Sequence, residues 1–459
     1  MDAIAIASPL KQVRVPANPL EQDRALVRPI ERSGWKFWAF SLVLVGIWLW
    51  GMGAWIRQLE SGLEVTGLNV PVYWGLYITN FVFFIGISHA GTLISAILRL
   101  CNAEWRRPIT RAAEIITVLV LFFGAGCVIL DLGRPDRVLN VLLHPNFRSP
   151  LVWDVCSISV YLTASMVYLF LPLIPDIALL RDHTRRHRWL YRPLALGWTG
   201  TPRQKRNLNR AIAVMAVLVI PVAVSVHTVV SWVFAMTVQP MWHSTIFGPY
   251  FVVGAIFSGI GAILIAMAVV RRVYHLEAYL KPIHFHHLGL LLLVMALLWV
   301  YFTFAEFLTT YYGSEPSHMA VFRAKISGPY APLFWTMIAT CFVIPFTLLV
   351  IRPVRSSIWG CVTAAVSVEI GMWLERYLIV VPSLSHPRLP RADVAYQASW
   401  VEWALLASFL AFFVFLYGVF SRFFPIVSIW EMREGREHAL DEVVERVRKV
   451  LPGVPEAAP

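Results

Sequence analysis

Ten long stretches of apolar residues recur along this chain, and they constrain its fold more than any other feature of the sequence. A helix that crosses the hydrocarbon core of a bilayer needs about 20 mostly apolar residues. Many of the stretches end in Trp or Tyr, the residues that anchor helices at membrane surfaces. The sequence therefore predicts an all-α polytopic membrane protein with about ten transmembrane helices, at residues 37–56, 71–100, 112–131, 151–175, 210–238, 245–270, 288–312, 330–351, 357–381 and 400–424.

The charged residues agree with a membrane protein and argue against nucleic acid as a partner. Only 14% of the residues are charged and 58% are hydrophobic, whereas soluble domains are about 25% charged. The net charge is +12, but the basic residues lie in short segments between apolar stretches. A nucleic-acid-binding face would gather them with aromatic residues. The sequence therefore predicts a chain that is embedded in membrane lipid and does not bind nucleic acid.

The distribution of Lys and Arg predicts the orientation in the membrane. The chain has 39 Lys and Arg residues, and we number each loop by the apolar stretch that it follows. The N-terminal segment, the C-terminal segment and the even-numbered loops with their helix ends hold 30 of them, whereas the odd-numbered loops hold eight. Basic residues favour the cytoplasmic side. We expect a multi-pass protein of a bacterial inner membrane with cytoplasmic segments at 1–36 and 426–459, around a transmembrane domain at 37–425. A charged stretch from Glu431 to Lys449 has helical spacing of its apolar residues.

A weak internal repeat predicts how the helices are grouped. The second stretch reads Ser88-His89-Ala90-Gly91-Thr92-Leu93-Ile94, and the sixth reads Ser258-Gly259-Ile260-Gly261-Ala262-Ile263-Leu264. The fourth and eighth stretches also begin alike, with Pro-Leu-X-Trp. Repeats four helices apart run in the same direction. We expect two four-helix bundles, helices 2–5 (71–238) and helices 6–9 (245–381), flanked by helices 1 and 10.

Charged residues inside or at the ends of these helices are the candidate functional residues. A charge near the bilayer centre costs at least about 2.5–3.5 kcal/mol, so each one needs a physical reason. The predicted orientation brings several to one depth near the outer face, where a functional site is favoured over unrelated structural ion pairs. These residues are Asp131, Arg134, Asp136, Arg137, Arg148, Asp154, Glu306, Glu375 and Arg376.

Each of these residues also has a purely structural interpretation. In Asp131-Leu132-Gly133-Arg134-Pro135, the acid can pair with Arg134 and fix a turn. Asp154 can cap the start of a helix. His89 and His227 lie inside helices, where each is either a core histidine bonded to a neighbouring hydroxyl or a proton-relay group, since histidine titrates near neutral pH.

The cysteines and histidines argue against a metal cofactor in this chain. None of the five cysteines forms a CxxC pair, so an iron–sulfur site is not predicted. The intramembrane histidines are single on their helices, which argues against stacked haems.

Several long motifs resemble one family of membrane subunits. They are Ile78-Thr79-Asn80-Phe81-Val82-Phe83-Phe84-Ile85-Gly86-Ile87-Ser88-His89-Ala90-Gly91-Thr92-Leu93-Ile94-Ser95-Ala96, Phe147-Arg148-Ser149-Pro150-Leu151-Val152-Trp153-Asp154, Gly248-Pro249-Tyr250-Phe251-Val252-Val253-Gly254-Ala255-Ile256-Phe257-Ser258-Gly259 and Gly371-Met372-Trp373-Leu374-Glu375-Arg376. The chain resembles the NrfD/PsrC (polysulfide reductase membrane subunit) family over residues 35 to 425. Within it, the resemblance is closest to the quinol-binding membrane subunit of alternative complex III.

The resemblance implies a quinone-binding subunit that is catalytic only with partners. The cofactor would be a non-covalent quinone, menaquinone or ubiquinone. The partners would be an extracytoplasmic iron–sulfur subunit, a multihaem cytochrome c and a second NrfD-like subunit. The quinone pocket would lie in the first bundle near the outer face. Two differences from alternative complex III stand out: His is usual where this chain has Asp131, and a family Asp is replaced by Val233.

These considerations assign a role to each candidate residue. Asp131, Asp154 and His89 are the predicted catalytic residues. The predicted quinone-binding residues are Asp131, Arg134, Arg148 and Asp154. The two arginines would keep the two aspartates in their charged form. The predicted proton path comprises His89, His227, Glu306, Glu375 and Arg376. Two alternatives stay open: a secondary transporter, which the repeat and the buried ionisable groups would also suit, and a passive anchor that has lost the quinone site.

Overall fold

The computed structural model describes residues 23–31, 34–184, 186–388 and 395–450, and within these ranges all regular secondary structure is helical. The all-α polytopic fold is therefore confirmed. Much of the predicted N-terminal segment, residues 1–22 and 32–33, and the end of the predicted tail, residues 451–459, lie outside the described residues.

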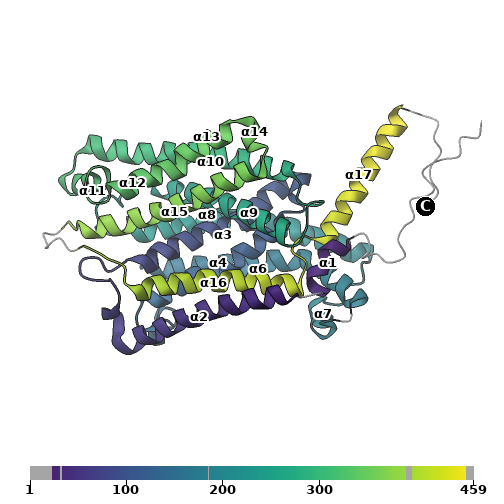
Figure 1. Ribbon diagram of the computed structural model, residues 1–459, viewed down its shortest axis with the longest axis horizontal. Helices are drawn as coiled ribbons and strands as arrows, with labels where there is room; N and C mark the ends of the chain where they lie inside the picture. Colours follow the sequence, from purple (N-terminus) through teal and green to yellow (C-terminus); the bar gives the residue numbers. More distant parts are fainter. Residues whose placement is uncertain (1–22, 32–33, 185, 389–394, 451–459) are drawn as a thin grey trace, which may run out of the picture.

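Nine helices in the described ranges are long and apolar enough to cross a membrane. A tenth long helix, α15 (Ile358–Ser385), runs alongside them and corresponds to the ninth predicted stretch, although it is not among the nine (Figure 1). The nine are α2 (Trp35–Ser61, continued by a 3-10 turn to Val65), α3 (Leu76–Leu100), α4 (Thr110–Asp131), α6 (Pro150–His183), α8 (Pro202–Ala235), α9 (Phe247–Val273), α10 (Pro282–Gly313), the segment Ala331–Val350 and α16 (Trp400–Phe423). The segment Ala331–Val350 consists of α12 (Ala331–Ile338), a π-helical turn (Ala339–Val343) and α13 (Ile344–Val350).

Shorter helices mark the two ends of the molecule. In Figure 1, α1 (Arg24–Glu31), α7 (Arg188–Leu194) and α17 (Ile429–Val450) gather at one end, which we call the inner end. At the opposite, outer end lies α11 (Pro316–Ile326). The predicted helix at 431–449 corresponds to α17. Two further short helices are α5 (Asn140–Leu143) and α14 (Arg352–Arg355).

The long helices pack as two groups of four with a flanking pair. In the first group, α3 packs against α4 and α8, and α6 packs against the same two helices. In the second group, α9 packs against α10 and α15, and α12–α13 complete the ring. The groups meet where α3 contacts α9 and α15, and the pair α2 and α16 packs beside α4. This arrangement agrees with the two predicted bundles flanked by the first and last helices.

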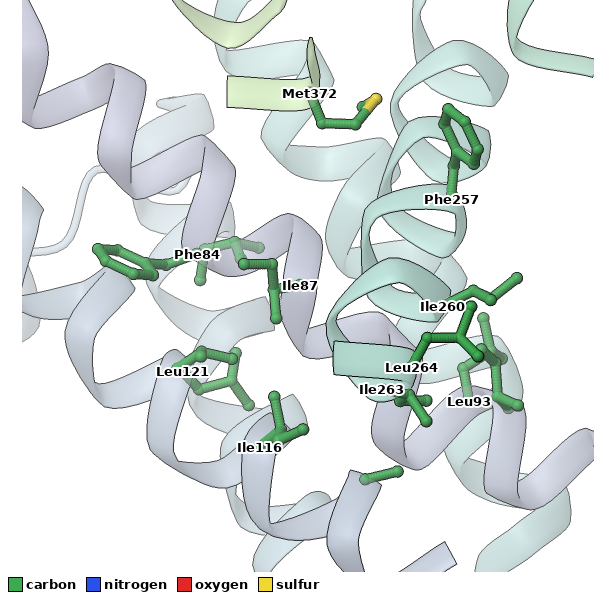
Figure 2. Packing of buried hydrophobic residues seen from close by; sticks show 14 of the residues in the cluster. Phe84, Ile87, Leu93, Ile116, Leu121, Phe257, Ile260, Ile263, Leu264 and Met372 are labelled. Atoms are coloured by element: carbon green, nitrogen blue, oxygen red, sulfur yellow. The ribbon is translucent and has the colours of Figure 1, made fainter. Parts of the chain in front are cut away.

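The contact between the groups is closely packed. Figure 2 shows buried residues of both groups in one view, with Phe84 of α3 and Leu121 of α4 on one side and Phe257 of α9 and Met372 of α15 on the other. Lipid tails are as apolar as these side chains, so close van der Waals packing, rather than exclusion from water, holds such helices together. Interfaces of this kind therefore depend on small residues where backbones approach.

Gly91 is such a residue, and we expect Gly91→Ala to destabilise the protein. A Cβ at this position would lie 1.9 Å from the Ala113 backbone oxygen of α4 and 2.2 Å from the Thr117 hydroxyl oxygen. Overpacking of this kind costs about 1–3 kcal/mol, which thermal unfolding in detergent would detect as a lower melting temperature. The matched control is Gly86→Ala on the same helix, where the new Cβ would lie 3.4 Å from Ser258 Oγ. Equal melting temperatures for the two variants would contradict the prediction.

Candidate functional site

Two histidines meet between α3 and α8, deep inside the first group of helices. His89 and His227 are buried, and their ring centroids lie 3.6 Å apart. His89 Nε2 lies 2.6 Å from the carbonyl oxygen of Ala223. A ring nitrogen that bonds a carbonyl must carry the hydrogen, so His89 Nδ1 is left with an open lone pair. The Nδ1 atoms of both histidines are buried without a hydrogen-bond partner in the described ranges.

A buried ion pair on α15 lies against this histidine pair. Arg376 Nη1 lies 3.0 Å from Glu375 Oε2, and both side chains are almost fully buried. The positive charge of Arg376 acts on His227. Gly254 of α9 makes room for the guanidinium, because a Cβ there would lie 2.7 Å from Arg376 Nη2. We call His89, His227, Glu375 and Arg376 the central cluster; four of the five residues predicted for the proton path thus lie together.

The fifth, Glu306 of α10, lies nearer the outer end. It lines a cavity of about 410 Å³, together with His243 and His318. Lys325 of α11 is also buried here, and the negative charges of Glu306 and Glu375 both act on it. Burial lowers the pKa of Lys325 to about 8, and the two carboxylates counter this only in part. Lys325 therefore lies between the outer cavity and the central cluster, although it was not among the residues predicted from the sequence.

A line of buried polar residues follows one face of α6 along its whole length. Its members are separated by three, four, seven or eight residues, which places them on one helix face. From Asp154 to Asp176 there are 22 residues, or roughly 33 Å of helix, close to the roughly 30 Å of a bilayer core. We call this line the α6 polar stripe: Asp154, Tyr161, Ser165, Tyr168 and Asp176, all buried.

The upper part of the stripe contacts α3 next to His89. Tyr161 donates a hydrogen bond to the carbonyl oxygen of Ser88 at 2.9 Å, and its ring centroid lies 5.3 Å from that of His89. One helical turn further along, the Thr92 hydroxyl lies 3.3 Å from that of Ser165. The stripe therefore continues from the central cluster toward the inner end.

The lower part of the stripe reaches a buried carboxyl group on α4. The Ser95 hydroxyl donates to Glu114 Oε1 at 2.7 Å and lies 3.4 Å from the hydroxyl of Tyr168. Beyond Glu114 lies Glu431, the second acid of this region, which forms ion pairs with Arg99 and with a second arginine of the inner loop. The polar groups thus extend to the inner surface.

The α6 polar stripe ends where the start of α17 contacts the first group of helices. Asp176 forms a buried ion pair with Arg111 of α4. It also accepts hydrogen bonds from the backbone N–H groups of Ile429 at 3.1 Å and Trp430 at 2.8 Å. Burial acts to raise the pKa of Glu431, the next residue along α17, but the neighbouring arginines outweigh it and hold this pKa below its ordinary value. Glu431 is therefore a charged structural group at neutral pH.

The outer end of α4 differs from the prediction. Asp131 ends the helix with a buried Oδ1 that lacks a partner in the described ranges. Arg134 does not pair with it, so that predicted ion pair is wrong. Instead, Arg134 Nη2 bonds Asp136 Oδ2 at 2.9 Å, and both side chains are exposed. The reason is the intervening turn at Gly133, whose φ is +65°. The charged group that acts on Asp131 is Glu402 of α16.

Asp154 lies near the start of α6 but does not cap it. The residue before the helix is Ser149, and the Asp154 side chain lies within the first turns, with a buried Oδ1 that has no partner in the described ranges. Arg148 is exposed and forms no ion pair with Asp154 or Asp131 there. The expectation that Arg134 and Arg148 hold the two aspartates charged by pairing is therefore wrong. Quinone binding by these four residues stays a prediction.

The described residues contain no group of three or more His, Cys, Asp or Glu side chains placed to hold a metal ion. Residues 64–387 match the family model described as "Polysulphide reductase, NrfD". The chain belongs to the NrfD family. The predicted family is thus confirmed, while the narrower resemblance to alternative complex III stays a prediction.

Named relatives of this NrfD-family chain are membrane subunits of reductases and of an oxidoreductase. It is 32% identical over 224 residues to a putative dimethyl sulfoxide reductase membrane subunit from Halobacterium salinarum, over 48% of this chain and 49% of that protein. The chain therefore spans about half the length of this relative. An Hdr-like menaquinol oxidoreductase integral membrane subunit from Archaeoglobus fulgidus is 23% identical, over 91% and 98% of the two chains. A menaquinone reductase integral membrane subunit from Nitratidesulfovibrio vulgaris is also 23% identical, over 86% and 92%.

Proposed function

We propose that this chain is the quinone-binding integral membrane subunit of a multisubunit respiratory oxidoreductase. It exchanges electrons between membrane quinol and an extracytoplasmic iron–sulfur partner. The family match and the relatives named as menaquinol oxidoreductase and menaquinone reductase subunits support this function. The bias of basic residues supports a bacterial inner membrane location with cytoplasmic termini.

The observation that carries the proposal is the α6 polar stripe with Asp154 at its outer end. Quinol oxidation releases two electrons and two protons, so a quinol site needs a group that accepts a proton. Asp154 has a buried oxygen without a partner in the described ranges, which is the atom that a quinol hydroxyl would contact. Asp131 offers a second such oxygen at the same end of the bundle, beside α2 and α16.

The central cluster and the stripe provide groups that hold protons between the outer and the inner end. His89 keeps its Nε2 hydrogen on the Ala223 carbonyl, so Nδ1 is the atom that takes up a proton. Tyr161 lies beside it, and Ser95 links the lower stripe to Glu114. Proton transfer inward along these groups would accompany the electron transfer outward. Histidine and carboxyl groups in a row are typical of proton relays in membranes.

Electrons pass between this chain and its partners. An iron–sulfur subunit on the outer side is the acceptor or donor, and the proposed complex also includes a multihaem cytochrome c and a second NrfD-like subunit. The chain acts catalytically only within this complex.

The decisive measurement is made on the complex purified from its native membranes. Organic extraction should recover quinone, and added quinol should reduce the iron–sulfur clusters of the partner, followed by electron paramagnetic resonance. A complex without quinone and without cluster reduction would indicate a passive anchor. Ion or solute uptake by the chain in liposomes, without quinol-dependent reduction, would indicate a secondary transporter instead. Either result overturns the proposal.

A further inference from the structure

A second cavity lies on the other side of α3 and α4, away from the α6 polar stripe. It has a volume of about 320 Å³ and is bounded by α3, α4, α9, α15 and α16. Its walls are apolar and include the rings of Phe83, Phe84 and Phe413. Val269, Leu410 and Val414 at its rim are 43–54% exposed. Exposed apolar residues on membrane-spanning helices face lipid, so the cavity opens sideways into the bilayer.

The single acid in this lining, Glu369 of α15, has no visible structural reason to be there. Both of its carboxyl oxygens are buried and lack a side-chain partner in the described ranges; the backbone of Ala262 is the one donor that acts on the carboxyl group, and part of the side chain is exposed. Gly261 of α9 makes room for this carboxyl, because a Cβ there would lie 2.5 Å from Glu369 Oε1. The hydroxyl of Tyr417, which also lines the cavity, is likewise buried without a partner among the described residues.

Unpartnered polar groups at this depth point to a ligand. A buried polar atom without a hydrogen bond is destabilising by about 1–3 kcal/mol, and the hydrocarbon core offers no water to relieve it. A neutral carboxyl group can donate one hydrogen bond and accept another, and a tyrosine hydroxyl can do the same. A ligand that brings a carbonyl or hydroxyl oxygen through the apolar mouth would satisfy both groups.

The depth of Glu369 distinguishes between two lipid-soluble ligands. It lies 11 residues from the start of α15 at Ile358, or roughly 17 Å along the helix. The ester and phosphate groups of a phospholipid lie near the membrane surface, and the lining contains no Lys or Arg among the described residues to pair with a phosphate. A quinone ring is neutral and flat and carries two oxygens, so it suits aromatic walls and two hydrogen-bonding groups.

We propose that this cavity is a second quinone-binding site, with Glu369 and Tyr417 as the hydrogen-bonding groups for the ring oxygens. It rests on the proposed function, since it takes the same membrane carrier. It is separate from the Asp154 region, because it opens between α9 and α16 rather than on α6. Tyr417 lies six residues before the inner end of α16 at Phe423, which places the site in the inner half of the molecule.

The test is photolabelling of the purified complex with an azido-quinone, followed by peptide mapping. Labelled peptides are expected from α15 or α16, in addition to those from the outer site. Glu369→Leu should reduce the inner labelling by about tenfold and leave the outer labelling unchanged, whereas Glu369→Gln should retain it. Tyr417→Phe removes only the hydroxyl and should give a partial loss. Val366→Leu, at an exposed position on the same helix, is the matched control.

Each other outcome would contradict the inference. Labelling confined to the outer site, or inner labelling that Glu369→Leu and Tyr417→Phe both leave intact, would remove this site while the proposed function stands. A phospholipid that copurifies with wild type and is lost in Glu369→Leu, without inner quinone labelling, would assign the cavity to lipid. No labelling anywhere would contradict the proposed function as well.

Discussion

Replacing Asp154 with asparagine is expected to lower quinol-dependent turnover of the complex by about 10²–10⁴-fold, the usual contribution of a group that transfers a proton. Asparagine has the shape of aspartate but cannot take up the proton of a quinol. The Asp154 Oδ1 has no hydrogen-bond partner in the described ranges, so this substitution breaks no bond of that oxygen and should leave assembly intact. Turnover is measured by quinol oxidation in the purified complex, and assembly by the yield of co-purified partner subunits.

Asp136→Asn is the matched control for this prediction. Asp136 is an exposed acid near the same end of the bundle, paired at 2.9 Å with Arg134. Exposed ion pairs contribute little, so turnover should stay unchanged. Asp131→Asn tests the second unpartnered carboxyl in the same way. Normal turnover of Asp154→Asn would remove this residue from the mechanism, even if quinone remains bound to the complex.

The sequence predicted the helices well because the bilayer requires about 20 apolar residues for each. The predicted helix ends were wrong where helices continue beyond the hydrocarbon core of the membrane. The fourth stretch was predicted to end at residue 175, but α6 continues to His183, and α8 begins at Pro202 rather than at 210. These extensions carry charged residues such as Asp176 and Arg203, which hydropathy assigns to loops. The helix continues because its backbone remains hydrogen-bonded whatever the surroundings.

The individual site residues were easier to predict than their contacts. His89 and His227 were recognised as buried histidines, but their pairing depends on how α3 packs against α8, which no local pattern specifies. The Asp131–Arg134 pair was wrong because residue spacing alone does not determine the direction in which a turn sends a side chain. At Gly133 the left-handed backbone turns the chain, and Arg134 pairs with Asp136 instead.

Other functional candidates were missed although the sequence contained a signal. The members of the α6 polar stripe recur at intervals of three, four, seven and eight residues, which is the spacing of one helix face. Glu369 lies in the apolar stretch 357–381, six residues before Glu375, and an ionisable residue inside such a stretch is itself the signal. Glu114 lies inside the predicted stretch 112–131 but was not among the candidate residues, because its contact with Ser95 joins two different helices.

The buried ion pair of α15 should be the most sensitive point for stability. We expect Arg376→Leu to destabilise the protein by about 3–5 kcal/mol, the usual effect of leaving one buried charge without its partner. Glu375 would remain as a buried carboxylate whose hydrogen bonds come from uncharged groups, the hydroxyl of Tyr250 and Trp299 Nε1, which lies 2.5 Å from Glu375 Oε1. The effect is measured as a loss of melting temperature in detergent. Arg134→Leu, which removes an exposed arginine, should leave the melting temperature unchanged.

The double variant Glu375→Gln, Arg376→Gln separates the charge effect from packing. Both side chains keep most of their volume, and glutamine at 375 can still accept the hydrogen bond from Trp299. With no buried charge left unpaired, the double variant should be more stable than Arg376→Leu, because neutral replacement of a buried pair is often tolerated. If the double variant is the less stable of the two, the ion pair contributes net stability of its own. If it is the more stable but shows no proton-coupled turnover, the charges are retained for function rather than for folding.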